Sequence, residues 1–109
     1  MDVFVAPTTG GDSRNVTPNT KETHDSHPRW SPSGDRLVFV SDRTGWRNIG
    51  VIDVETATTT MLTTSEWDEG NPHWSPDGKW IAYVANKSWN FHIMLVPADG
   101  SKEPMQLTR

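Results

Sequence analysis

The chain has 109 residues, an ordinary length for one small domain, and a formal net charge of −4. It lacks the basic surface that contacts nucleic-acid phosphates, and no apolar run is long enough to cross a membrane, so neither nucleic acid nor membrane is an expected partner. Apolar residues make up only 33% of the chain, which contains six tryptophans and no cysteine; we expect a thin core with large aromatic side chains and no disulfide.

The first predicted elements are two short strands at the N-terminal end. Residues 2–6 (DVFVA) are mostly β-branched or aromatic and end at Pro7, which is typical of a strand. Residues 8–12 are predicted to form a turn, and residues 13–17 are a weaker strand candidate. The polar residues 18–26 are predicted to be a loop.

A tryptophan followed by a tight polar turn and an apolar run occurs twice, 44 residues apart. The first copy is HPRWSPSGDRLVFVS (27–41) and the second is NPHWSPDGKWIAYVA (71–85). In each turn the proline presets φ and the glycine accepts a positive φ, which predicts a tight reversal between two strands. The two motif tryptophans are expected to pack between neighbouring repeats. A structural role is assigned to the motif residues Pro28, Trp30, Ser31, Pro32, Gly34, Pro72, Trp74, Ser75, Pro76, Asp77 and Gly78.

Two further strands are predicted after each copy. They cover residues 48–54 and 58–63 after the first copy, and residues 91–96 and 105–108 after the second. The N-terminal residues DVFVAPTTGG align with HIMLVPADGS (92–101), so the first two strands correspond to the third and fourth strands of a preceding copy. The chain therefore contains half a repeat and two complete repeats.

Four short strands in roughly 40–45 residues is the pattern of a β-propeller blade. The uninterrupted apolar run Leu37–Val40 is typical of a strand that is covered on both faces, as blade strands are. We predict an all-β chain without α-helix: a partial β-propeller with a half blade at 1–20 and blades at 24–64 and 68–109. A β-sandwich of consecutive hairpins is the alternative, which the 44-residue repetition disfavours.

The segments HPRWSPSGDRLVFVSDRTG and NPHWSPDGKWIAYVANKS resemble the TolB-like, or PD40, β-propeller repeat over nearly the whole chain. That repeat has a proline, then W-S-P-D-G-K, an apolar strand and an S-x-R-x-G turn. The first copy keeps this last turn (41–45), whereas the second has ANKSW (85–89), which implies a differently shaped turn. The resemblance implies one of two settings: a protein-binding TolB-like propeller, or the N-terminal propeller of a prolyl oligopeptidase-family serine peptidase, such as a dipeptidyl or acylaminoacyl peptidase.

The leading functional prediction from this resemblance is a non-catalytic propeller segment of such a peptidase, which gates or positions peptide substrate. The expected partners are the remaining blades and a hydrolase domain of the same parent protein, together with a peptide or protein ligand. The alternative is a TolB-like propeller that binds proteins and has no enzyme domain. The family's nucleophile lies in a G-x-S-x-G motif, which this chain lacks, so no catalytic residue is assigned and no cofactor is expected.

Metal and acid–base sites are weakly indicated. His24 and His27 have a spacing that suits a metal, but the sequence suggests no third ligand nearby. Packing or solvent-facing roles are therefore expected for all four histidines, which are His24, His27, His73 and His92. Asp77 and Asp99 precede glycines, where a short carboxylate caps the local backbone. The other carboxylates predicted in turns are Asp42, Asp53, Asp68 and Glu69.

Strand order predicts that the longer loops share one face of the molecule. These loops are 18–26, 42–47, 65–70 and 86–90, and the SPSGD and SPDGK turns lie on the opposite face. Aromatic residues and arginine are enriched where proteins contact partners. We therefore predict a partner-contact surface that contains Trp46, Arg47, Trp67, Asp68 and Trp89. The alternative is that these side chains lean onto the neighbouring blade.

The predicted number of blades also has a consequence for association. Two and a half blades do not close a ring, so an isolated chain would expose apolar blade faces and free strand edges. Self-association is therefore expected if the chain exists alone.

Overall fold

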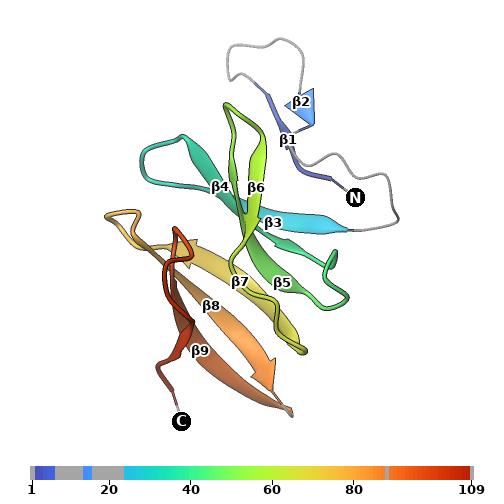
Figure 1. Ribbon diagram of the computed structural model, residues 1–109, viewed down its shortest axis with the longest axis vertical. Coiled ribbons are helices and arrows are strands. Elements are labelled where there is room, and N and C mark those ends of the chain that lie inside the picture. Colours follow the sequence, from blue (N-terminus) through green and yellow to red (C-terminus); the bar gives the residue numbers. More distant parts are fainter. Residues whose placement is uncertain (1, 7–13, 16–23, 88, 109) are drawn as a thin grey trace.

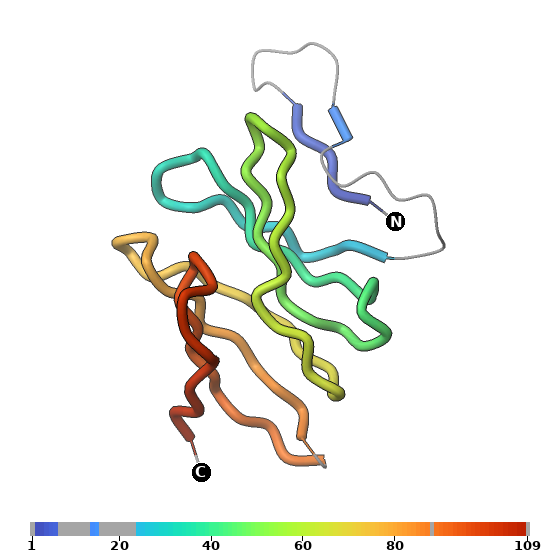
Figure 2. Tube along the Cα trace, in the orientation of Figure 1, coloured from blue at the N-terminus to red at the C-terminus, as the bar shows by residue number. Residues whose placement is uncertain are grey.

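The computed structural model describes residues 2–6, 14–15, 24–87 and 89–108. Ten strands form three antiparallel sheets in this part of the chain, and it contains no helix. Consequently, nothing among these residues resembles a membrane-spanning helix. The strands at the N-terminal end (blue) lie in the upper half of the molecule along its long axis, and the C-terminal strands (red) lie in the lower half (Figure 2).

The smallest sheet consists of the two strands predicted at the N-terminal end. Strand β1 (Phe4–Val5) pairs in antiparallel fashion with β2 (Arg14–Asn15). This pairing agrees with the prediction that these strands correspond to the third and fourth strands of a repeat. Val16 and Thr17, which were predicted to continue the second strand, lie outside the described residues.

The other two sheets each contain four strands that lie side by side in chain order (Figure 1). The first sheet consists of β3 (Asp25–Trp30), β4 (Arg36–Ser41), β5 (Asn48–Asp53) and β6 (Thr58–Met61). The second consists of β7 (Asp68–Trp74), β8 (Trp80–Lys87), β9 (Asn90–Pro97) and β10 (Met105–Gln106). Such consecutive antiparallel sheets are the blades of a β-propeller, so the predicted all-β partial propeller is confirmed. We refer to them as the first and second blades.

The first strand of each blade is longer than the sequence predicted. Strand β3 begins at Asp25 and β7 at Asp68, so the ends of the two predicted loops are strand residues. Each strand contains a register shift, and at the same repeat position His27 and Asn71 have φ values of 55° and 53°. A proline follows directly in both repeats, and because proline has no N–H to donate, it is tolerated at such a bulge.

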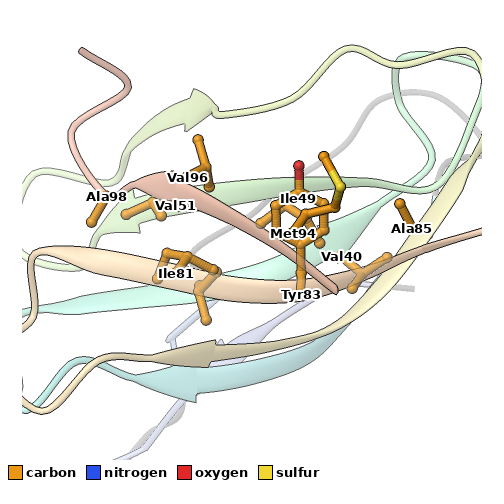
Figure 3. Packing of buried hydrophobic residues seen from close by; sticks show 10 residues of the cluster. Val40, Ile49, Val51, Ile81, Tyr83, Ala85, Met94, Val96 and Ala98 are labelled. Atoms are coloured by element: carbon orange, nitrogen blue, oxygen red, sulfur yellow. The ribbon is translucent and has the colours of Figure 1, made fainter. Parts of the chain in front are cut away.

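The two blades pack face to face around a shared apolar core (Figure 3). The first blade contributes Val38, Val40, Ile49 and Val51, and the second contributes Ile81, Tyr83, Ala85, Met94, Val96 and Ala98. On the opposite face of β4, Leu37 and Phe39 pack against Val3 from the N-terminal pair of strands. Strand β4 is therefore covered on both faces, as its uninterrupted apolar run predicted.

The repeated SPSG and SPDG turns have the same backbone geometry. The amide of Ser31 donates to the carbonyl of Arg36, and the amide of Ser75 donates to that of Trp80, both at 2.8 Å. The turn glycines, Gly34 and Gly78, have φ values of 77° and 75°, which an L side chain adopts only with strain. Each serine hydroxyl also accepts a hydrogen bond from the backbone five residues later, so the motif closes its own hairpin.

The second motif tryptophan connects the two blades. Trp74 Nε1 donates to the carbonyl of Arg29 at 2.9 Å, and the guanidinium of Arg36 lies 4.9 Å from the centre of its ring. Trp30, at the same repeat position, is 49% exposed, so its packing between blades stays a prediction. Trp74 bonds to β3, the first strand of the preceding blade. The described residues contain no equivalent strand before β3 for Trp30 to contact.

Candidate functional site

The longer connections gather on one face of the two blades, which we call the loop face. It comprises the β4–β5 turn (42–47), the β6–β7 connection (62–67) and the β8–β9 turn at Trp89, toward the lower right of Figure 1. The SPSG and SPDG turns lie at the other ends of the strands. Residues 18–23, which were predicted on the same face, lie outside the described part of the chain.

A groove with a volume of about 560 Å³ opens between the beginnings of β3 and β7, and we call it the interblade groove. Its lining includes His24, His27, Asp42 and Arg47 from the first blade and Glu69 and Asn71 from the second, with Val40 as an apolar contact. Most of these side chains are polar, and their partners decide which of them remain available to a ligand.

His24 and Asp42 bind each other at the edge of the groove. The amide of His24 donates to Asp42 Oδ1 at 2.7 Å, and His24 Nδ1 lies 3.2 Å from Oδ2. The hydrogen bond from the His24 amide is the main reason that the pKa of Asp42 lies below its usual value. The carboxylate of Asp42 is therefore ionised, and both of its oxygens contact His24.

The neighbouring acid, Asp25, is fully buried and pairs with Arg43. Arg43 Nη2 donates to both carboxylate oxygens, at 3.2 and 3.1 Å, and Arg43 Nε donates to Ser41 Oγ at 2.9 Å. The ring of His27 instead contacts Ser26 Oγ at 2.9 Å. The histidine pair that has metal-like spacing thus faces other partners, and no metal-binding group of three or more His, Cys, Asp or Glu residues occurs where the structure describes the chain.

Arg47 and Asp68, two residues of the predicted contact surface, meet where the β4–β5 turn touches β7. The amide of Arg47 donates to Asp68 Oδ1 at 3.0 Å, and the amide of Glu69 donates to the Arg47 carbonyl at 2.7 Å. Asp68 therefore fixes the turn onto the second blade. Arg47 lines the groove, and its guanidinium makes no hydrogen bond or ion pair with any described residue.

Glu69, which was predicted to be a turn carboxylate, is a buried strand residue. It is only 3% exposed, and its carboxylate accepts hydrogen bonds from Thr63 Oγ1 and from Trp67 Nε1. Burial is the dominant effect and raises the pKa of Glu69. The hydroxyl of Tyr83 is also buried, without a hydrogen-bond partner among the described residues, and burial together with the charge of Glu69 raises the pKa of Tyr83.

The 44-residue period contains a signal for this buried acid that the motif-based predictions missed. Asp25 and Glu69 occupy the same position of the repeat, as do Arg43 and Lys87. Aligning the two copies beyond their WSPxG motifs would have shown an acid near the start of the first strand and a cation near the end of the second strand in each blade.

The three tryptophans of the loop face have different environments. Trp67 is half-buried against the shared core, with Lys87 Nζ 4.7 Å from the centre of its ring, so it packs onto the fold. Trp46 is 45% exposed, and Trp89 is 94% exposed. Trp89 also has a φ of 68°, a left-handed conformation that is uncommon for a bulky residue.

The turns that carry the two exposed tryptophans differ in length. In the first blade Ser41 pairs with Asn48, which leaves six residues in the turn, whereas in the second blade Lys87 pairs with Asn90. The different shape that the sequence indicated for the second turn is confirmed.

Replacing Glu69 with glutamine is expected to remove one component of the pH dependence of stability. Because the pKa of Glu69 in the folded chain is raised above its usual value of 4.5, its contribution to stability is complete below pH 4.5 and is lost as pH rises through the raised pKa. Urea unfolding of both proteins between pH 4 and 8 measures this. The stability of the wild type should fall relative to that of Glu69→Gln as pH increases, and parallel curves would contradict the expectation.

Comparisons with known proteins agree with this architecture. A family model described as PD40, the TolB beta propeller domain, matches residues 2–108. A structure assigned as TolB from Agrobacterium tumefaciens has 29% sequence identity and a TM-score of 0.83; the match covers 99% of this chain and 38% of that protein. TolB from Acinetobacter baumannii, at 24% identity and a TM-score of 0.81, shares the fold over 97% of this chain and 26% of its own. No curated protein sequence matches the chain.

Proposed function

The chain belongs to the PD40 family of TolB β-propeller domains, and from this premise we propose that it is part of a protein-binding propeller whose loop face contacts another protein. A TolB-type propeller is a non-catalytic domain, so its function depends on what its surfaces bind. The two TolB structures support a propeller setting for this chain, which spans 38% and 26% of their lengths. The crosslinking experiment described below would identify the contacted protein.

The observation that carries this proposal is the environment of Trp89. An indole that is 94% exposed contributes little to folding, and its left-handed φ costs on the order of 1 kcal/mol. Tryptophan is also among the residues most enriched at binding hot spots. Trp46, on the neighbouring turn, is the second exposed indole of the loop face, and the interblade groove opens on this face.

The peptidase setting is the other proposal that the repeat motif allows. In that setting the propeller would gate or position peptide substrate for a hydrolase domain of the same parent protein. The matching family model and the Agrobacterium tumefaciens structure are of TolB type, which supports proposing the binding module first. A G-x-S-x-G motif encoded in the same gene would reverse this preference.

Site-specific photo-crosslinking tests the proposed binding face. We expect that p-benzoylphenylalanine at position 89, introduced in cells of the source organism, gives a discrete adduct with another protein. Lys102, an exposed residue next to the β9–β10 turn, provides the matched control at a distance from the loop face. No adduct from position 89, or the same adducts from both positions, would contradict the proposal.

A further inference from the structure

Resting on the function proposed above, we propose that the interblade groove binds a carboxylate of the partner protein and that Arg47 is its main contact. The carboxylate belongs either to the partner's free C-terminus or to the side chain of an Asp or Glu, because both present the same two oxygens. The groove, with a volume of about 560 Å³, has room for such a group and lies on the same face as the exposed indoles.

The acids of the groove are already engaged within the protein. Asp42 accepts from the amide of His24 and faces its ring, and Glu69 accepts from Thr63 and Trp67. A cationic ligand would therefore compete with bonds that the protein makes with itself. This arrangement disfavours an amine or guanidinium as the bound group.

The donors of the groove remain available. The guanidinium of Arg47 has no hydrogen-bond or ion-pair partner among the described residues. His27 uses Nδ1 toward Ser26, which leaves Nε2, and Asn71 uses its amide oxygen toward His73, which leaves the amide nitrogen. The groove therefore has hydrogen-bond donors without acceptors, and a carboxylate supplies the acceptors.

Arg47 is also held in place before any ligand arrives. Its amide and its carbonyl are both hydrogen-bonded to the beginning of β7, through Asp68 and Glu69. Only the side chain then has to become ordered on binding, which reduces the entropic cost. A guanidinium binds a carboxylate through two parallel hydrogen bonds, a geometry that lysine does not reproduce.

Titration of the whole protein with short peptides, followed by NMR, tests this assignment. The probes are acetyl-Gly-Ala-Phe with a free C-terminus, the same peptide amidated, and amidated acetyl-Gly-Glu-Phe and acetyl-Gly-Gln-Phe. We expect each carboxylate peptide to bind about tenfold or more tightly than its neutral counterpart. The shifts should be centred on the amides of His27, Arg47 and Asn71. The peptide that binds more tightly identifies the source of the carboxylate.

Three variants determine whether Arg47 is responsible. Arg47→Gln should weaken the binding of the carboxylate peptide by about tenfold or more, and Arg47→Lys should restore part of it. Arg29→Gln removes the same charge from an exposed side chain outside the groove and should change affinity by less than about twofold. The melting temperature of Arg47→Gln should equal that of the wild type, because its guanidinium supports no contact.

Equal binding of the carboxylate and neutral peptides, or unchanged binding by Arg47→Gln, would overturn the assignment of the groove. If the crosslink from position 89 persists in that case, the binding face stands and only the carboxylate contact is wrong. If the peptides bind through Arg47 but position 89 gives no adduct, the groove assignment stands and the proposed protein-binding face is wrong.

Discussion

Substitution of Asn48 by alanine is expected to lower the free energy of unfolding by about 3 kcal/mol. The Asn48 side chain is fully buried, and its amide nitrogen donates to Thr44 Oγ1 at 2.8 Å and to the Ser65 carbonyl at 3.2 Å. Its oxygen accepts from the Ser65 amide at 2.8 Å and lies 3.1 Å from Thr63 Oγ1. Alanine would leave these groups unpaired in the connection between the two blades.

Asn86 provides a matched control for this substitution. It is an asparagine in the second blade whose side-chain oxygen is buried without a hydrogen-bond partner among the described residues. Asn86→Ala should therefore change stability by less than about 1 kcal/mol, because no such bond is lost. Urea unfolding monitored by tryptophan fluorescence measures both variants. Equal losses for the two would show that Asn48 acts only by filling space.

The second large effect is expected at Asp25. Asp25→Ala removes a fully buried carboxylate and leaves the guanidinium of Arg43 without the two hydrogen bonds that it donates. Breaking a buried pair from one side typically costs about 3–5 kcal/mol, and because Arg43 is partly exposed, we expect the lower end of this range. Thermal and urea unfolding measure the loss.

A double-mutant cycle separates the pair from the individual side chains. Arg43→Ala also removes the bond to Ser41 and the contact with the ring of Phe39, so it is destabilising by itself. If the loss at Asp25 comes from the unpaired guanidinium, the double variant should be only slightly less stable than Arg43→Ala. Fully additive losses would show that Asp25 and Arg43 contribute independently.

The fold was accessible from the sequence because its signals are local and occur twice. Proline and glycine at fixed offsets in SPSG and SPDG specify each hairpin, and the apolar run Leu37–Val40 identifies a strand with two covered faces. The period then places both blades in register. Strands β3 and β7 extend beyond the prediction because pairing continues past the bulges at His27 and Asn71 into polar residues that were interpreted as loops.

The buried polar side chains could not be identified in this way. Asn48 bonds to Ser65, 17 residues away, and Arg43 bonds to Asp25 at a separation of 18. Single-residue patterns do not reveal such partners, since an acid beside a loop has the same local sequence whether it is solvated or buried. The pKa of Glu69 is raised because the fold buries its carboxylate beside Thr63 and Trp67, which the local sequence does not show.

The predicted contact surface separates into two groups for a related reason. Topology brings Trp46, Arg47, Trp67, Asp68 and Trp89 to one face, but it does not determine which side chains turn inward. Trp67 donates to the carboxylate of Glu69, and Asp68 accepts from the amide of Arg47, so both side chains stabilise the fold. The side chains of Trp46, Arg47 and Trp89 make no hydrogen bond or ion pair with a described residue, and the proposed binding face rests on them.

The shared core between the blades determines how the molecule unfolds. Val40 and Ile49 from one repeat contact the same cluster as Tyr83 and Met94 from the next, so neither sheet keeps its interior when the other melts. We therefore expect the two repeats to unfold as one cooperative unit. The N-terminal pair of strands is joined to the first blade through Val3 and a smaller cluster, so we expect it to open first by sub-global unfolding.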